Sequence, residues 1–384
     1  MSEKLKGVIL CPSLPAEKWL SMDLYLEDVK NALATAEPDL AVEVVDVPTS
    51  TDMARFQLFK TRHLDYPRLL KKHLSSKPEG GAGWVTHVLD HSYGHLCNVP
   101  GRNRQVATCH DLANVREGLT LKLASQILWN YRVKALRNAE FIHAISENTK
   151  ADVIEVLEIP EDRVEVVLYG ISESFHAHAP ELQASLRHAF EEQYPVARNA
   201  HLALHVGTNV NRKNMETLLH GLHLLKGRQT PDRKPTRLVK IGDPILTSEH
   251  RALIDELDLA DEIIDVGMLN FDDLLDHYNL CDVFTFPSSY EGFGRPILEA
   301  QACGLPCILA DSSCLSEVGG SGALYHPTQC AETLADHVAL FRDDSEKAKE
   351  YARAGHENAA RFSWAAHGKG LLELYRRALQ VPSG

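Results

Sequence analysis

Residues 283–300 read VFTFPSSYEGFGRPILEA, and this stretch decides the fold class. Its first four residues form an apolar run typical of a buried strand, and an apolar run with helical spacing begins near Pro296. A strand that leads through a glycine turn into a helix is the repeating element of a parallel α/β sheet. Such sheets bind ligands at the carboxyl ends of their strands, so the turn at 287–294 is a candidate site.

Short apolar runs alternate with helical periodicity along the whole chain, which predicts an α/β protein with mainly parallel sheets. The strands predicted in the first half are 7–11, 42–45, 84–89, 105–109, 140–144 and 164–167, and the helices are 22–33, 119–136 and 147–157. The pattern restarts with strands at 202–206, 237–241, 263–266, 283–286 and 307–309. No strand is predicted after residue 309, and the chain ends with helices at 331–341, 346–360 and 364–379. The 384 residues therefore predict two Rossmann-like domains, with the boundary between residues 172 and 200.

The turn at 287–294 combines small residues with two flanking carboxylates. Gly292 and Gly294 let backbone N–H groups approach an anion, and the dipole of the following helix favours a phosphate there. Glu291 and Glu299 can accept hydrogen bonds from hydroxyl groups. A phosphate-binding turn between two carboxylates that can accept hydrogen bonds from hydroxyl groups predicts a nucleotide-sugar site. A plain tight turn with no ligand is the alternative. The later segment 311–313 is interpreted as a simple turn, and a position near the donor is the alternative.

Two further strand ends carry polar signals. The segment GTNVNRKN at 207–214 follows the strand 202–206 and precedes a helix. Arg212 and Lys213 oppose the dipole at that helix start, a conflict that a bound diphosphate would relieve. His110, in the segment TCHDL at 108–112, stands at the carboxyl end of a predicted strand, where a functional role is favoured over a structural one.

Composition excludes several classes of protein. No run approaches the ~18–20 apolar residues of a membrane-spanning helix. The 8 cysteines are scattered without a Cys-x-x-Cys pair, which predicts reduced thiols in a cytoplasmic protein. The net charge of −13 argues against nucleic acid as a partner. His87, His91 and His95 are spaced by four, but their segment begins as a strand, so no metal site is expected.

Positive charge is concentrated in residues 53–77, which hold seven Lys and Arg against one acid. A solvated basic face is the simplest interpretation. The alternatives are an anionic acceptor or peripheral contact with the inner face of a membrane.

The chain resembles the retaining glycosyltransferases of family 4, also called glycosyltransferase group 1, on the GT-B fold. The resemblance covers most of the length. It rests on the His110 element, AISENTK at 144–150, HVGT at 205–208 with RKN at 212–214, VG at 266–267, the Glu pair of YEGFG at 290–294 and Glu299, and SEVGG at 316–320.

The resemblance implies two facing Rossmann-like domains: an acceptor-side domain at 1–180, a donor domain at 198–360, and a C-terminal helix at 361–384 that returns to the first domain. It implies that Lys213 and Arg212 neutralise the donor diphosphate, that Glu299 binds the ribose, and that Leu269 lies against the base. Glu291, with the backbone of Phe293 and Gly294, would hold the transferred sugar, and His110 would reach that sugar.

The implied reaction is transfer of a hexosyl group from a nucleoside diphosphate sugar to a glycan or lipid-linked acceptor in polysaccharide biosynthesis, without a metal or other cofactor. GDP-mannose is favoured over UDP-hexoses. A sugar-nucleotide epimerase, a phosphorylase and a non-catalytic binding subunit are the alternatives. The sequence departs from the family at Thr208, where many members have Arg, and at 18–23, where many have paired glycines.

Overall fold

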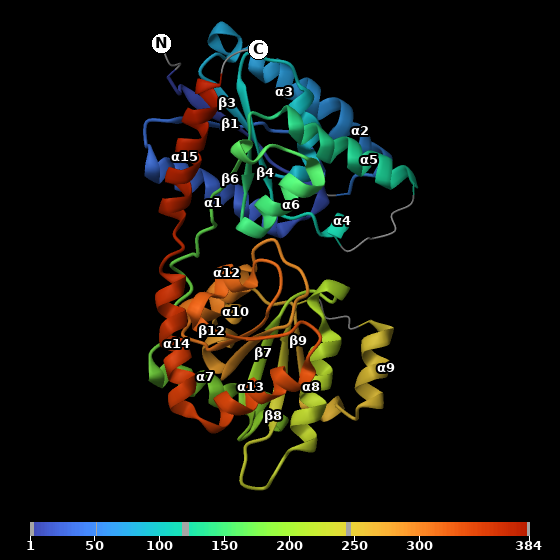
Figure 1. Cartoon of the computed structure of the whole chain (residues 1–384), viewed down its shortest axis with the longest axis vertical. Helices are drawn as coiled ribbons and strands as arrows, with labels where there is room; N and C mark the ends of the chain where they lie inside the picture. Colours follow the sequence, from blue (N-terminus) through green and yellow to red (C-terminus); the bar gives the residue numbers. More distant parts are fainter. Residues whose placement is uncertain (1–3, 51, 117–122, 243–246, 382–384) are drawn as a thin grey trace. The chain divides into compact units, whose positions relative to one another are not determined.

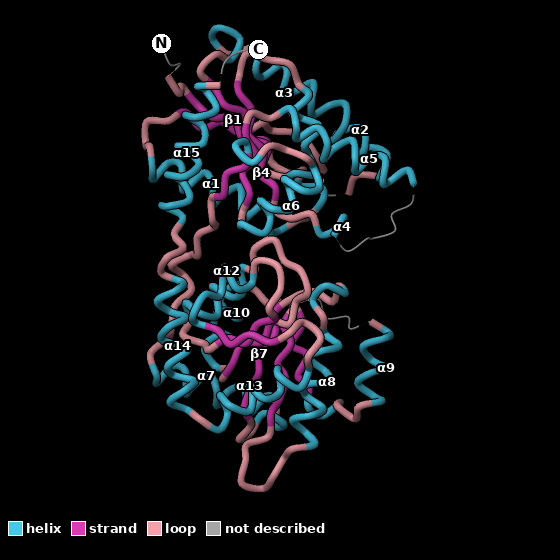
Figure 2. The backbone as a smooth tube through the Cα atoms, in the orientation of Figure 1, coloured by secondary structure: helices cyan, strands magenta, loops and turns pink. Residues whose placement is uncertain are grey.

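The computed structural model describes residues 4–50, 52–116, 123–242 and 247–381. The chain divides into two compact units: Met1–Gly170 with Ser363–Gly384, and Ile171–Phe362. Within the described residues, each unit contains one parallel sheet of six strands. Helices lie on both faces of each sheet (Figures 1 and 2). The α/β fold class with parallel sheets is therefore confirmed.

In the first unit the strand order is β2-β1-β3-β4-β5-β6. Apolar side chains from one face of the central strands form a core cluster with the helices that cover that face, and every residue of β1 and β3 is buried. The strands are β1 (Gly7–Cys11), β2 (Ala41–Val44), β3 (Trp84–Val88), β4 (Arg104–Cys109), β5 (Phe141–Ala144) and β6 (Val164–Val166). The helices are α1 (Leu20–Ala36), α2 (Arg55–Lys60), α3 (Tyr66–Ser75), α4 (Ala113–Arg116), α5 (Leu123–Lys134), α6 (Glu147–Leu157) and α15 (Trp364–Gln380).

In the second unit the strand order is β12-β11-β10-β7-β8-β9, so the direction of winding reverses between β7 and β10. The strands are β7 (His201–Val206), β8 (Thr236–Ile241), β9 (Ile263–Gly267), β10 (Val283–Phe286), β11 (Cys307–Ala310) and β12 (Ala323–His326). The helices are α7 (Pro180–Gln193), α8 (Met215–Gly227), α9 (Ser248–Glu256), α10 (Phe271–Leu280), α11 (Arg295–Ala302), α12 (Leu315–Gly319), α13 (Ala331–Asp343) and α14 (Ser345–Ala359).

Two sequence-based predictions differ from the structure. The prediction of no strand after residue 309 is wrong, because β12 pairs with β11 in parallel. Four residues between a glycine and a proline are too few to show alternation. The first unit also ends at Gly170, before the predicted limit at residue 180. Residues 171–180 stay with the second unit because Phe175 packs edge-on against Phe271 and Tyr278, with ring centroids 5.0 and 5.9 Å apart.

The C-terminal helix α15 belongs to the first unit, as the GT-B prediction requires, and packs against α1. Figure 1 shows the two helices side by side. At their closest approach, a Cβ atom on Gly368 would lie 2.3 Å from the carbonyl oxygen of Ala32. Any larger residue at position 368 would push α15 and α1 apart at this crossing.

Buried histidines join α15 to the first sheet. His87 hydrogen-bonds with the Tyr375 hydroxyl of α15 through Nδ1 at 2.7 Å and with Thr108 Oγ1 through Nε2 at 2.7 Å. Thr108 Oγ1 also lies 3.0 Å from His143 Nδ1. His367 on α15 bonds with the carbonyl oxygen of Leu168 at 2.9 Å. The imidazole rings lie too close together for several of them to be protonated and positively charged at once.

We expect the first unit to lose stability in mild acid. Burial lowers the pKa of His87 to about 3 and that of His367 to about 4, and it holds the pKa of His143 well below its usual range. Below pH ~6.5 these histidines bind protons in the unfolded chain but stay neutral in the folded unit. The free energy of unfolding therefore decreases as the pH is lowered, by about 1 kcal/mol per histidine between pH 6.5 and 5.5.

The measurement is urea denaturation at pH 7.5, 6.5 and 5.5, followed by tryptophan fluorescence. All 4 tryptophans lie in the first unit, so the signal reports that unit alone. His87→Gln keeps a donor and an acceptor but removes one titrating group, and it should flatten the pH dependence. Equal slopes for the parent and the variant would contradict the explanation.

Candidate functional site

Two turns of the second unit meet where its sheet changes winding direction. One turn follows β7 and the other follows β10, and these two strands are neighbours in the sheet. Because the strands are parallel, their carboxyl ends open at the same edge. A reversal of strand order leaves a crevice between the two following connections, which is the usual ligand site of an open α/β sheet.

A buried ion cluster occupies this position. Lys213 Nζ lies 2.6 Å from Glu291 Oε1, and Arg212 Nη1 lies 2.7 Å from Glu291 Oε2. Glu291 is 7% exposed and Lys213 is 8% exposed. The Lys213 ammonium also stands 4.6 Å from the centre of the Phe286 ring at the end of β10. We call these three charged residues, Arg212, Lys213 and Glu291, the ion triad.

The carboxylate of the triad is ionised at neutral pH. Burial raises the pKa of Glu291, but the charges of Lys213 and Arg212 lower it by more, and the resulting pKa lies below the ordinary value. The triad therefore carries two positive charges and one negative charge. Its net positive charge can attract an anion, although the Glu291 carboxylate is already paired with both cations.

Backbone contacts fix the positions from which the triad side chains extend. The N–H of Ser289 donates to the carbonyl oxygen of Arg212 at 2.7 Å and ties the two turns together. The N–H of Glu291 donates to Ser313 Oγ at 3.0 Å. Ser313 has a φ of 45°, a left-handed conformation that costs energy for a residue with a side chain. The interpretation of 311–313 as a simple turn missed this contact, and no sequence pattern indicates it.

The glycine turn after Glu291 leads directly into α11. Gly294 is the residue before the helix and has a φ of 90°, and Pro296 stands in the first turn. Gly292 and Phe293 are buried between Glu291 and the helix start. The amino-terminal end of α11 therefore opens beside the triad, as predicted for a phosphate site.

The other predicted donor residues lie on the same unit with different partners. Glu299 lies on α11, and its Oε2 accepts a hydrogen bond from the Tyr278 hydroxyl at 2.9 Å. Burial raises the pKa of Glu299 despite the nearby Arg295. Thr208 is exposed in the turn after β7, and Leu269 is half-buried in the loop after β9. Tyr278 was missed because it reads as an ordinary core residue of a helix.

His110 lies in the first unit, directly after β4. Its Nε2 bonds with the carbonyl oxygen of Leu89 at 2.7 Å, and its Nδ1 bonds with the Tyr169 hydroxyl. A carbonyl only accepts, so Nε2 carries the proton and Nδ1 accepts from Tyr169. Burial lowers the pKa of His110, which keeps the ring neutral.

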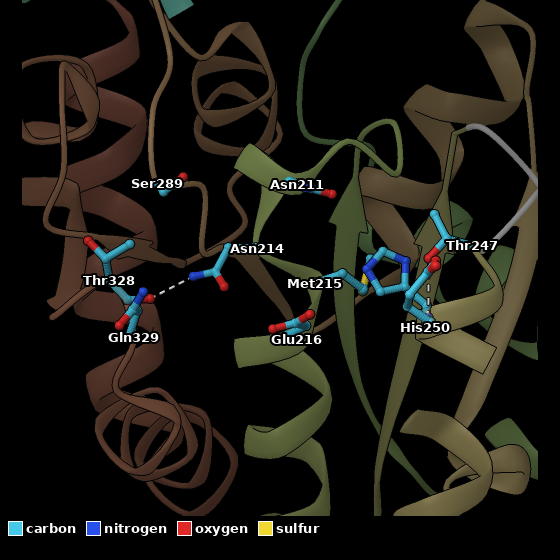
Figure 3. Close-up of a pocket in the computed structure, with 10 residues that line it drawn as sticks. Asn211, Asn214, Met215, Glu216, Thr247, His250, Ser289, Thr328 and Gln329 are labelled. Atoms are coloured by element: carbon cyan, nitrogen blue, oxygen red, sulfur yellow. Dashed lines mark hydrogen bonds between the residues drawn. The ribbon is translucent and has the colours of Figure 1, made fainter. Parts of the chain in front are cut away.

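A pocket of about 590 Å³ lies next to the turns that carry the ion triad, and Figure 3 shows the residues that line it. Asn211 and Ser289 from the two triad turns line it, and Glu216 and His250 face it from the helices. Asn214 Nδ2 closes one wall by donating to the carbonyl oxygen of Thr328 at 2.6 Å. The carboxylates of Glu216 and Glu249 make this pocket unsuited to phosphate. Within residues 4–50, 52–116, 123–242 and 247–381, no group of three or more His, Cys, Asp or Glu could hold a metal ion.

Two families match this sequence. The family described as glycosyl transferases group 1 matches residues 187–358, and the glycosyltransferase family 4 domain matches residues 31–175. The two matches together span most of both units, including the ion triad. The chain belongs to the group 1 glycosyltransferases, and its architecture is the GT-B fold.

Characterised relatives include bacterial mannosyltransferases. The chain is 29% identical over 309 residues to the serotype-specific mannosyltransferase WbdA of Escherichia coli, a match that covers 76% of this chain and 36% of WbdA. It therefore spans about a third of that relative's length. It is 27% identical to O-antigen chain mannosyltransferase B of Escherichia coli, over 60% of this chain and 59% of that protein.

Solved structures share the fold across nearly the whole chain. Sucrose-phosphate synthase from Thermosynechococcus elongatus superimposes with a TM-score of 0.76 at 20% identity, over 98% of this chain and 100% of that one. The Anabaena protein HepE, solved in complex with UDP and glucose, gives a TM-score of 0.70 at 17% identity, over 96% and 99% of the two chains.

Proposed function

We propose that the protein transfers a mannosyl group from GDP-mannose to a hydroxyl of a glycan or lipid-linked acceptor in polysaccharide biosynthesis, with retention of the anomeric configuration. The observation that carries the proposal is the ion triad at the switch point of the second sheet, beside the start of α11. The names of the relatives support mannose as the sugar, and the UDP complex of HepE keeps UDP-hexoses as the alternative donors.

Each predicted donor residue then has a role. Arg212 and Lys213 bind the diphosphate, with help from the backbone of the turn at Thr208 and of the Gly292–Gly294 turn. Glu291 binds hydroxyls of the transferred sugar, and Glu299 binds those of the ribose. Leu269 lies against the base. His110 can bond with the sugar only if one of its ring nitrogens leaves its present partner, Leu89 or Tyr169.

The chemistry needs positive charge at the diphosphate. As the bond to the sugar breaks, positive charge develops on the sugar and negative charge on the leaving phosphate. Fixed cations that face the developing negative charge stabilise the transition state more than the ground state. Lys213 and Arg212 come from one rigid turn and so supply this charge without rearrangement of the backbone.

Retention can arise through a covalent intermediate or through attack on the face from which the leaving group departs. Glu291 is the candidate nucleophile of the first route. Two ion pairs at 2.6 and 2.7 Å withdraw electron density from its carboxylate. This pairing favours the second route, with Glu291 orienting the sugar.

Removal of the Lys213 charge should slow transfer. We expect Lys213→Ala to lower the turnover number about 10²–10³-fold at saturating GDP-mannose, because one contact to a developing anion contributes ~3–4 kcal/mol to the transition state. Turnover is measured as mannose incorporated into a mannose-terminated glycan. Lys226→Ala is the matched control, since Lys226 lies on α8 and pairs with Asp258, outside the triad. Turnover of Lys213→Ala within about threefold of the control would remove Lys213 from the site.

The same transfer should not require a divalent metal. The predicted cradle offers Arg212, Lys213 and backbone N–H groups to the diphosphate, which take the place that Mg²⁺ fills in other nucleotide-sugar enzymes. We expect activity after dialysis against EDTA to stay within about twofold of the untreated enzyme. Loss of activity that Mg²⁺ or Mn²⁺ restores would reassign the carboxylates to a metal.

The basic segment 53–77 presents a mixed apolar and cationic surface that we propose rests on anionic lipid. Phe56 is 77% exposed and stands among exposed cations of α2 and α3. Arg132 of α5 reaches the same region through a 2.8 Å contact with His63, and Ile127 of α5 is 62% exposed.

Not every cation of the segment contributes to this surface, because Arg62 is buried against Glu17. The exposed cations are Arg55, Lys60, Arg68, Lys71 and Lys72. Among the described residues, no helix is long and apolar enough to span a bilayer.

Cosedimentation with vesicles tests this surface. We expect binding to vesicles that contain phosphatidylglycerol and little binding to pure phosphatidylcholine, with a loss of affinity as salt is raised. Phe56→Ser should weaken binding severalfold, because it removes an aromatic ring from the interface. Leu182→Ser changes an exposed leucine of the second unit and is the control. Equal binding of both variants would show that the surface does not meet lipid.

A further inference from the structure

The carboxylate of Glu291 holds both cations that the donor diphosphate needs. Its two oxygens contact one cation each, Oε1 with Lys213 at 2.6 Å and Oε2 with Arg212 at 2.7 Å. A carboxylate that bridges two cations presents its oxygens much as two phosphate oxygens would. The triad is therefore already occupied by an anion that belongs to the protein.

Phosphate oxygens and the Glu291 carboxylate cannot take the same N–H donors together. Moving Glu291 aside without a new partner would leave a buried carboxylate uncompensated, which is strongly unfavourable. A bound diphosphate would also bring further negative charge beside it. Binding of a diphosphate thus depends on what Glu291 can bond with after it leaves the cations.

A donor sugar and a free nucleoside diphosphate differ at this point. The sugar carries hydroxyl groups that donate hydrogen bonds to a carboxylate, whereas the ionised terminal phosphate of the free nucleoside diphosphate offers oxygen acceptors only. We propose that Glu291 is a specificity-determining residue that competes with nucleoside diphosphate for Arg212 and Lys213, and that releases both cations only when sugar hydroxyls take its carboxylate. This inference rests on the donor site proposed above and adds discrimination against the product.

The surroundings of the triad allow a side-chain exchange with little backbone motion. The N–H of Glu291 is held by Ser313 Oγ at 3.0 Å, and its carbonyl oxygen accepts from Cys314 Sγ at 3.1 Å. The carbonyl oxygen of Arg212 is held by Ser289. After transfer, the sugar leaves with the acceptor, and Glu291 can pair again with the cations and displace the nucleoside diphosphate.

The proposal makes a prediction opposite to that of a simple sugar-binding role. Glu291→Gln removes the competing charge and keeps the shape of the side chain. We expect this variant to bind free nucleoside diphosphate about tenfold or more tightly than the parent. If Glu291 only binds the sugar, the affinity for a ligand without a sugar does not change.

Isothermal titration calorimetry measures these affinities with GDP, UDP, dTDP and ADP, and then with the matching nucleotide sugar. The parent should prefer the nucleotide sugar over the free diphosphate, and Glu291→Gln should lose most of that preference. Glu291→Asp, which is too short to bridge both cations, should fall between the two. Glu216→Gln removes a carboxylate from the neighbouring pocket and should change each affinity by less than about twofold.

The outcomes separate the two proposals. If none of the matching nucleotide sugars binds the parent, or if Lys213→Ala binds the nucleotide sugar as well as the parent does, the donor site itself is wrong. If the parent binds but Glu291→Gln and Glu291→Asp bind the diphosphate equally or more weakly, the competition is overturned. Circular dichroism spectra identify a misfolded variant, and either of the two Glu291 variants suffices for the comparison.

Discussion

A carboxylate can be buried as an anion only if nearby groups compensate its charge, and Glu291 meets this requirement through Arg212 and Lys213 alone among the described cations. That pairing places two requirements on the structure of the second unit. It needs the turns after β7 and β10 to be adjacent, which the strand order provides. It also needs a short approach between the two backbones, which the hydrogen bond from Ser289 to Arg212 provides. The chemistry of the site therefore depends on the winding of the sheet and on this backbone contact.

The first unit meets a similar requirement at its own switch point, between β1 and β3. Arg62 Nη1 lies 2.5 Å from Glu17 Oε1, and the Tyr93 hydroxyl donates to Glu17 Oε2 at 2.6 Å. Lys18, the next residue, adopts a left-handed conformation with a φ of 56°. A buried ion pair and a left-handed lysine therefore stand in the turn after β1. The turn after β1 is thus both charged and tightly bonded.

Much of the fold could be predicted from sequence, because periodicity records burial. The strands 7–11 and 283–286 and the helix 147–157 were predicted with the observed bounds. β12 was missed because four residues, two of them buried and two half-buried, are too few to show a period. The contacts of Ser313 and Tyr278 were missed because they depend on segments distant in sequence. The residue types at the site were predicted from strand ends. The bridging of both cations by Glu291 was not, since spacing does not reveal which opposite charges meet.

Pairing within the triad also bears on how tightly a group 1 enzyme should hold its ligands. Two bare cations at a helix start would bind any diphosphate, and the product of transfer keeps the diphosphate that the donor carried. An internal carboxylate lowers the net positive charge without removing either cation, so the field that acts on the leaving group can be restored when a sugar draws Glu291 away. The charge that aids bond cleavage is then available mainly while a sugar is present. On this argument, the buried anion does not weaken the site but makes its electrostatics conditional on the substrate.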